Sequence, residues 1–168
     1  MNPSFLHSFR KILPTRYNDP MEIKATLESE LKEAMKAGDD VRKRTIRMVL
    51  AAIRQVEIDR QVKLDETAVL AIIQKEIKTR RDTVTEARTA NRPDIVNGTE
   101  AEIIVLQGYL PEAVSEKELN DLVQAAIIEA GAASPADMGK VMKLLMPRVA
   151  GRAAGDQVSS AVRHLLHT

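Results

Sequence analysis

The residues of this chain best suited to binding chemistry are cations that surround two glycines near the C-terminus. Between Met138 and the C-terminus the sequence holds five basic residues and one acidic residue, a local net charge of +4. Because a glycine turn lets backbone N–H groups and guanidinium groups approach closely, this stretch predicts a phosphate-binding surface. Its candidate residues are Lys140, Lys143, Arg148, Gly151, Arg152 and Gly155.

A second basic face is expected on a helix nearer the N-terminus, where Lys43, Arg47 and Arg54 recur at heptad-like spacing. It would extend the phosphate-binding footprint. Both clusters also have an ordinary structural interpretation, because glycines commonly end helices and scattered basic side chains commonly cover a solvated surface. The residue pattern alone leaves these alternatives open.

Few residues are available for catalysis or metal binding. The chain has no cysteine, and its histidines, His7, His164 and His167, all lie near the ends. Disulfides, thiolate ligands and cysteine nucleophiles are therefore excluded, and a histidine-centred site is disfavoured. No G-x-S-x-G elbow, Walker loop or dinucleotide fingerprint occurs. We expect no cofactor, no metal and no catalytic activity of this chain alone.

Apolar residues recur at helical spacing through most of the chain, which predicts an all-α fold. The first helix ends at Gly38, and a second extends to about residue 62. A third opens at Asp65, and its polar side carries Lys75, Lys78, Arg81 and Arg88. A fourth is expected to follow the extended residue before Pro93, with Thr99 and Glu102 as a capping box.

Pro111 ends this first set of helices, because a proline in a helix interior removes a hydrogen bond. Three shorter helices follow, beginning near Ser115, Ser134 and Asp156, and Pro147 is expected to kink or end the second near Met146. We therefore predict a hairpin or bundle of long helices at residues 21–110 and a small three-helix domain at residues 115–168. Residues 1–20 are expected to be a disordered leader.

Composition limits the partners and the location. The net charge is +1 and aromatic residues make up 2%, so nucleic-acid contacts must come from local cationic clusters and lack aromatic stacking platforms. No apolar run approaches the ~18 residues that span a bilayer. Residues 1–20 lack an apolar core of secretory length. We expect a cytoplasmic protein without membrane contact, with an organellar presequence as the alternative for the basic residues 1–20.

Three strings resemble the YqeY family: IRMVLAAI at residues 46–53, TRRD at 79–82 with ANRP at 90–93, and DMGKVMKLLMPRVAGRAAG at 137–155. The resemblance covers about residues 21–168. In the last string Ala150 and Ala154 stand where the family commonly has Lys and Asp, and the absence of that Lys removes one basic residue from the turn. The family is similar to the tail domain of the B subunit of aspartyl/glutamyl-tRNA amidotransferase, which contacts tRNA while other parts of that enzyme perform catalysis.

The resemblance implies a free-standing tRNA-binding accessory module with an aminoacyl-tRNA amidotransferase or synthetase as a further partner. The basic residues would contact phosphates, and RNA shape would supply the specificity. We interpret the glutamine-dependent carbon–nitrogen ligase activity associated with such chains as inherited from the multidomain enzyme. The alternative is a helical protein–protein adaptor that docks through Met138, Met142 and Met146, a stripe that also suits a helix core.

Overall fold

The computed structural model describes residues 22–166, and in this range all regular structure is helical. Four longer helices come first: α2 (Glu22–Ala37), α3 (Asp40–Arg60), α4 (Glu66–Thr89) and α5 (Pro93–Gln107). They are followed by α6 (Glu116–Ala130), the 3-10 turn η1 (Pro135–Asp137), α7 (Met138–Val149) and α8 (Gly155–Leu166). The predicted all-α fold is confirmed, whereas the predicted leader at residues 1–20 lies outside the described residues.

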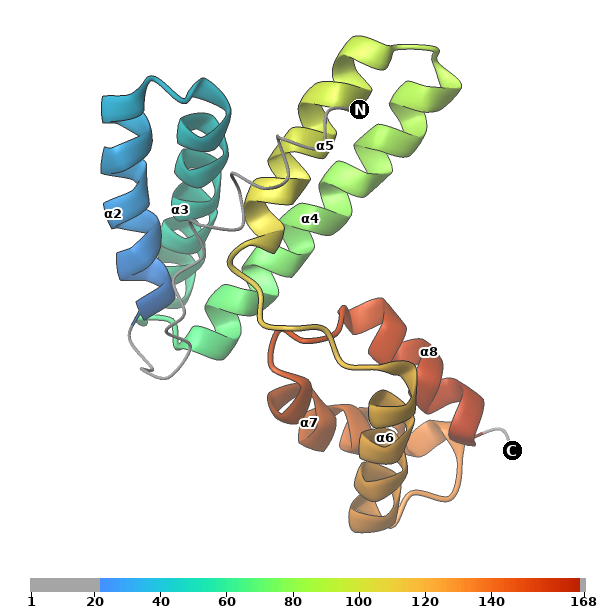
Figure 1. The fold of residues 1–168 in the computed structure, drawn as a ribbon. Coiled ribbons are helices and arrows are strands. Elements are labelled where there is room, and N and C mark those ends of the chain that lie inside the picture. Colours follow the sequence, from blue (N-terminus) through green and yellow to red (C-terminus); the bar gives the residue numbers. More distant parts are fainter. Residues whose placement is uncertain (1–21, 167–168) are drawn as a thin grey trace.

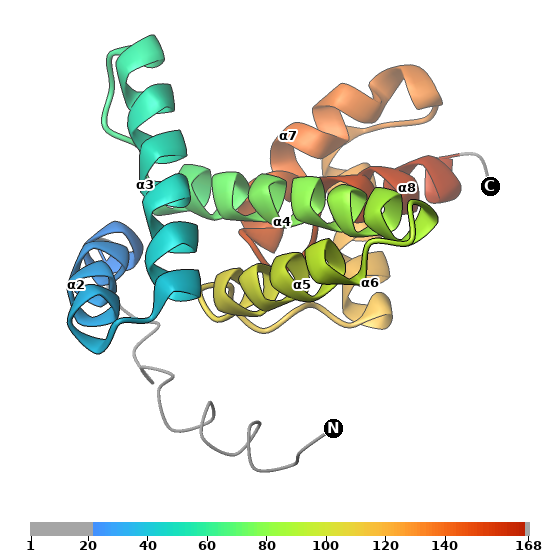
Figure 2. The same cartoon turned by 90° about the horizontal axis from the view of Figure 1, so that it is seen from above.

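The first four helices form two antiparallel hairpins, α2–α3 and α4–α5, which pack against each other (Figures 1 and 2). Their apolar faces meet in one cluster whose fully buried members include Leu27, Ile46, Ile53 and Ile73. Tyr109, just beyond α5, packs on the edge of this cluster and donates a hydrogen bond to Glu30 of α2. Glu30 also pairs with Arg42 at 2.6 Å, so this triad joins α2, α3 and the end of α5.

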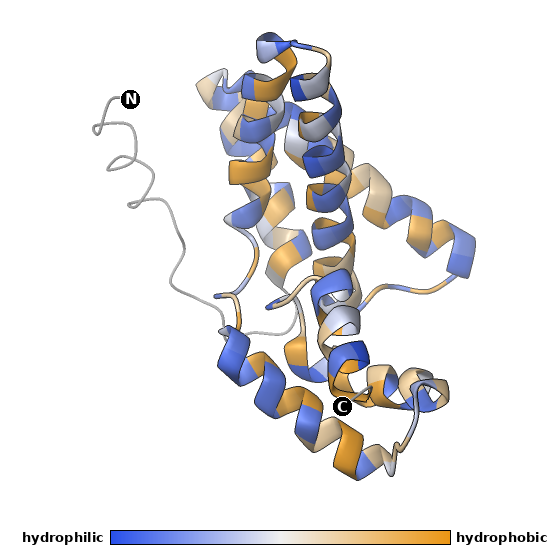
Figure 3. Ribbon diagram, turned by 90° about the vertical axis from the view of Figure 1, so that its right-hand side faces the viewer, coloured by the Kyte–Doolittle hydropathy of each residue, from blue (hydrophilic) through white to orange (hydrophobic). Residues whose placement is uncertain are grey.

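A second apolar cluster belongs to α6, α7 and α8, which lie together below α4 in Figure 1. Val123, Val141, Leu145, Val158 and Val162 are each fully buried in it. Orange and blue residues alternate along the helices in Figure 3, as expected where each helix buries one face only. The two clusters do not merge, so the C-terminal helices have a core of their own.

Helix boundaries follow from local capping chemistry. Asp39 accepts a hydrogen bond from the Arg42 backbone N–H at 3.0 Å and starts α3, and Asp65 does the same for α4 through Ala68 at 2.8 Å. Ser115 caps α6, and Gly131 ends that helix with φ of +59°. These caps lie where turn and capping residues occur in the sequence.

One predicted helix boundary is wrong, and one of the two outcomes expected at Pro147, a kink or an end, is excluded. The fourth helix begins at Pro93, not at a Thr99 capping box, because proline supplies the first helical position without needing a hydrogen-bond donor. Glu102 instead binds arginines of two other helices. Pro147 does not end α7, which continues to Val149. This proline lies in the last turn, where it removes only one of the backbone hydrogen bonds.

Candidate nucleic-acid interface and interdomain cleft

The glycine turn between α7 and α8 contacts α4 rather than projecting into solvent. Gly151 has φ of +77°, and a Cβ at this position would lie 2.9 Å from Leu70 Cδ1 and 3.0 Å from Leu70 Cβ. The side-chain amide of Gln74 donates to the carbonyl oxygens of Gly151 at 2.7 Å and Ala153 at 2.8 Å. Gly151 is therefore required by a close approach between the C-terminal helices and α4.

Arg152 fastens the same turn to the segment that links the two sets of helices. Its guanidinium group donates to both carboxylate oxygens of Glu118, at 2.8 and 3.0 Å, and to the carbonyl oxygen of Glu112 at 3.1 Å. The Val114 backbone N–H donates to the Arg152 carbonyl at 3.0 Å. Because the bidentate pair fixes the guanidinium plane, Arg152 acts in this structure as a clamp between turn, linker and α6.

The other predicted residues of the C-terminal cluster are divided between two positions. Lys140 and Lys143 lie one turn apart on the exposed side of α7, where Lys140 pairs with Asp137 at 2.7 Å. Lys143 has no carboxylate within ion-pair distance among residues 22–166. Arg148 reaches back to α6 and pairs with Glu129. Gly155 begins α8, and an added Cβ there would meet open space.

The second predicted cluster belongs to α3. Arg47 and Arg54 are exposed, and within the described part of the chain neither forms an ion pair. Arg47 donates only to the sulfur of Met35 at 3.6 Å. Lys43 pairs with Asp40, one turn away. The two predicted clusters therefore lie on different helix sets, and no ion pair within residues 22–166 joins one to the other.

The methionines proposed as a docking stripe contribute to the second core. Met138, Met142 and Met146 are partly buried and pack against the cluster formed by α6, α7 and α8. Their unbranched side chains suit the irregular gaps of a small core. This placement agrees with the core interpretation of the stripe, so an adaptor would need another surface.

A cleft that the sequence did not suggest lies where the two helix sets meet. It has a volume of about 400 Å³ and opens between α4, the linker after α5 and the turn that leads into α8. From α4 it receives Gln74, Ile77, Lys78, Arg81 and Asp82. Leu110, Pro111 and Gln107 line the linker side, and Arg152, Asp156 and Gln157 line the opposite wall.

The charges in this cleft are partly neutralised by one another. Lys78 of α4 pairs with Asp156 of α8 at 3.3 Å across the junction, and this contact lowers the pKa of the Asp156 carboxyl. Arg81 is exposed and forms no ion pair within residues 22–166. Sequence periodicity places Lys78 and Arg81 on one side of α4. The residues next to them in the sequence do not indicate that the turn before α8 lies opposite this side.

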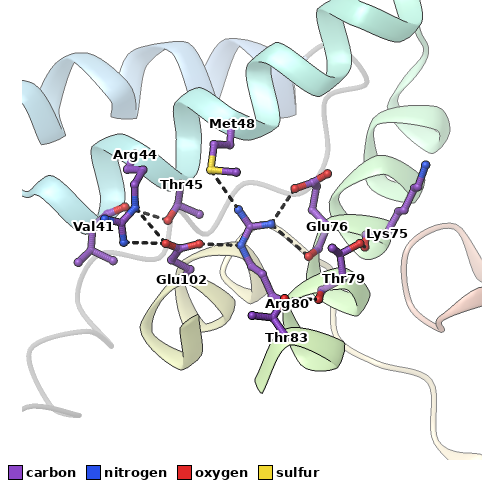
Figure 4. Close-up of polar contacts among 10 residues, drawn as sticks. All are labelled: Val41, Arg44, Thr45, Met48, Lys75, Glu76, Thr79, Arg80, Thr83 and Glu102. Carbon is purple, nitrogen blue, oxygen red and sulfur yellow. Dashed lines mark hydrogen bonds and ion pairs between the residues drawn. The ribbon is translucent and has the colours of Figure 1, made fainter. Parts of the chain in front are cut away.

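A buried polar network within the first helix set is structural. Arg80 of α4 is 6% exposed and binds Glu76 at 2.7 Å and Glu102 of α5 at 2.9 Å (Figure 4). Glu102 also binds Arg44 of α3 at 2.7 Å, so three helices share one network. All its charges are compensated, and it contains no exposed nucleophile or base.

No described helix is both long enough and apolar enough to cross a lipid bilayer. Among residues 22–166, no three histidine, aspartate or glutamate side chains gather as a metal-binding group. The features that remain are the cationic faces of α3 and α7 and the cleft beside α4.

The chain is similar to several curated proteins named "Altered inheritance of mitochondria protein 41, mitochondrial". It is 40% identical to that of Lachancea thermotolerans over 114 residues, covering 66% of this chain and 61% of the relative. It is 33% identical to that of Pyrenophora tritici-repentis over 138 residues, covering 80% of this chain and 75% of the relative. For Vanderwaltozyma polyspora the identity is 37%, covering 57% of this chain and 58% of the relative.

The matched region thus spans less than two thirds of two of these three relatives. Their names also correct the expected location. A cytoplasmic protein was predicted from the absence of cysteine and of a secretory core, but the relatives are named as mitochondrial proteins. The prediction was wrong because a reducing environment is not specific to the cytosol, so cysteine content does not separate the two compartments.

The sequence profile of the family described as "Yqey-like protein" matches residues 24–166. This range includes every described helix except the first two residues of α2, and therefore both helix sets and the cleft between them. The chain belongs to the YqeY family.

Proposed function

We propose that this chain binds the phosphate backbone of structured RNA, with tRNA as the ligand that the family resemblance implies, and that it acts as an accessory module rather than as a catalyst. The observation that carries the proposal is that three candidate cations, Arg47, Arg54 and Lys143, are exposed and have no ion-pair partner in the described chain. Cations in this state can release counterions from a nucleic acid without first losing a carboxylate partner.

The remaining candidates contribute less to such binding. Arg148 and Arg152 are held by Glu129 and Glu118, so a phosphate would have to replace an existing carboxylate. Lys43 and Lys140 have carboxylate partners one turn away on exposed surface, and such pairs are weak. The proposed footprint therefore consists of Arg47 and Arg54 on α3 and of Lys143 on α7, with Lys140 as a weakly paired fourth cation because its side chain is 70% exposed, against 30% for Lys43.

The test is filter binding of total tRNA to the full chain at two salt concentrations. With about four phosphate contacts, affinity should fall about a hundredfold between about 50 and about 200 mM salt. The double variants Arg47→Ala/Arg54→Ala and Lys140→Ala/Lys143→Ala should each reduce the salt slope by about 2.

The matched control is Arg88→Ala/Arg92→Ala, which removes two exposed cations that already pair with Glu100 and Asp94. It changes the net charge equally and should leave the slope nearly unchanged. An absence of tRNA binding at about 50 mM salt would exclude the function. If the control variant lost as much of the salt slope, overall charge alone would explain the effect of the test variants.

The location of this activity is proposed to be the mitochondrion. The names of the relatives support this, and so does the charge of residues 1–20, which contain Arg10, Lys11 and Arg16 but only one acid. Fractionation of cells that express the chain with a C-terminal tag tests it, and recovery in the cytosolic fraction alone would contradict it.

A further inference from the structure

The cleft between the helix sets has the size of a small-ligand site. Its volume of about 400 Å³ falls in the range of pockets that take ligands of nucleotide size. One wall is the side of α4, another is the linker after α5, and the third is the turn into α8. The cleft therefore depends on how the two helix sets are joined, and neither set forms it alone.

The groups that line the cleft differ along its walls. Leu110, Pro111 and Ile77 provide apolar surface, and Gln107 provides an amide that both donates and accepts hydrogen bonds. Gln157 provides an amide N–H donor, since its Oε1 already accepts from the Ala154 N–H at 3.2 Å. Arg81 provides a cation without an ion-pair partner in the described chain, and its planar guanidinium can stack on a base or bind a phosphate.

We propose that this cleft takes one nucleotide of single-stranded RNA. A nucleotide combines an apolar base face, polar base edges, sugar hydroxyls and one phosphodiester charge. Leu110 and Pro111 would contact the base face, the glutamine amides would contact the base edge, and Arg81 would contact the phosphate. The inference rests on the proposed RNA binding and assigns to this cleft a nucleotide that lies outside the duplex regions.

The charges argue against two simpler ligands. Asp82 and Asp156 also line the cleft, so an inorganic phosphate or an acidic peptide would meet carboxylates beside the cations. A nucleotide offers donors to those carboxylates, through its sugar hydroxyls and base amino groups. Lys78 is already paired with Asp156 and Arg152 with Glu118, which leaves Arg81 as the cation best placed for a single phosphate charge.

The test maps amide chemical shifts in the full chain with three probes: adenosine monophosphate, a single-stranded RNA hexamer and a blunt RNA duplex. The proposal expects the hexamer to shift amides of Gln74–Asp82, Gln107–Ala113 and Gly151–Gln157. The duplex should shift amides of α3 and α7 instead. Arg81→Ala should weaken hexamer binding about tenfold, the loss typical of one contact to a charged group.

Two matched variants sharpen this test. Gln107→Ala removes a second cleft contact from an exposed position, and Arg47→Ala removes a cation of the same type from α3. Arg81→Ala and Gln107→Ala should weaken hexamer binding more than duplex binding, and Arg47→Ala should do the reverse. Because both arginines are exposed and form no ion pair in the described chain, unfolding is not expected to obscure the comparison.

Each outcome has a defined meaning. Cleft shifts with the hexamer support the proposal with RNA as the source of the nucleotide, and cleft shifts with the monophosphate alone would overturn it in favour of a free nucleotide. If neither probe shifts the cleft amides, the inference is overturned, even where the duplex still binds to α3 and α7. If the duplex and tRNA also fail to bind, the proposed function is lost as well.

Discussion

Replacing Gly151 by alanine tests whether the glycine turn is needed for packing against α4. The added Cβ would lie 2.9–3.0 Å from three carbon atoms of Leu70, and the residue would have to keep φ of +77°. A left-handed alanine costs about 1 kcal/mol. Forcing a methyl group into a packed contact costs about 1–3 kcal/mol more. The free energy of unfolding should therefore fall by about 2–4 kcal/mol.

Two other glycines separate these contributions. Gly131 also has a positive φ, +59°, but an added Cβ there would meet nothing within 4 Å, so Gly131→Ala should cost only about 1 kcal/mol. Gly139 lies in α7 with open space around it, and Gly139→Ala should stabilise the chain by up to about 1 kcal/mol. The difference between the variants of Gly151 and Gly131 isolates the clash with Leu70.

A double-mutant cycle identifies the partner in that clash. Leu70→Ala removes the atoms that Gly151→Ala would meet, so in that background the second substitution should cost only the backbone strain. The other way to relieve the clash is a movement of the turn away from α4, which would break the two hydrogen bonds from Gln74. The side-chain amide signals of Gln74 would report such a movement.

The assay is urea denaturation of the four single variants and the double variant, followed by circular dichroism. The slope of each transition shows whether the two helix sets still unfold together. The reasoning is refuted if Gly151→Ala stays within about 0.5 kcal/mol of Gly131→Ala, the usual limit of additivity. It is also refuted if the Leu70→Ala background does not reduce the free-energy cost of Gly151→Ala.

Two further predictions concern charged groups. Arg80→Met should lower the free energy of unfolding by about 3 kcal/mol in urea denaturation, because it leaves the partly buried Glu76 and Glu102 without their shared cation; a loss no larger than that of the exposed control Arg88→Met would contradict it. The hydrogen bond from Arg92 lowers the pKa of Asp94 to about 2. Since this folded-state pKa is below the ordinary value, any stabilisation by the pair is present above pH 4 and lost as the pH falls toward 2. A carbon-detected NMR titration should return the Asp94 pKa to near 4 in Arg92→Ala, and an unchanged value would exclude Arg92 as the cause.

The sequence predicted those parts of the fold that depend on neighbours along the chain. Apolar spacing gave the helices, and Gly38, Ser115 and Gly131 marked boundaries that the structure retains. The Thr99 capping box failed because Glu102 is used by Arg44, 58 residues away, and by Arg80, 22 residues away. Sequence periodicity identifies a polar face but gives no information about such distant partners.

The same limit applies to the candidate site. The sequence placed cations around Gly151 and interpreted the glycine as an approach route for phosphate. In the structure the neighbour that requires a glycine is Leu70, which is remote in sequence and belongs to another helix set. The cleft could not be predicted at all, because its walls come from three segments whose only shared property is their position in space.

The basic residues fall into two groups, those that hold segments of the fold together and those that are available to a ligand. Arg152 joins turn, linker and α6 through three hydrogen bonds, and Gln74 joins the turn to α4. A residue that fixes the geometry of the cleft in this way cannot also exchange its partner for a phosphate without loosening the cleft. The cations outside such contacts, on the surfaces of α3 and α7 and at Arg81, are free of this conflict. RNA binding should therefore be most sensitive to residues that contribute least to the packing of the two helix sets.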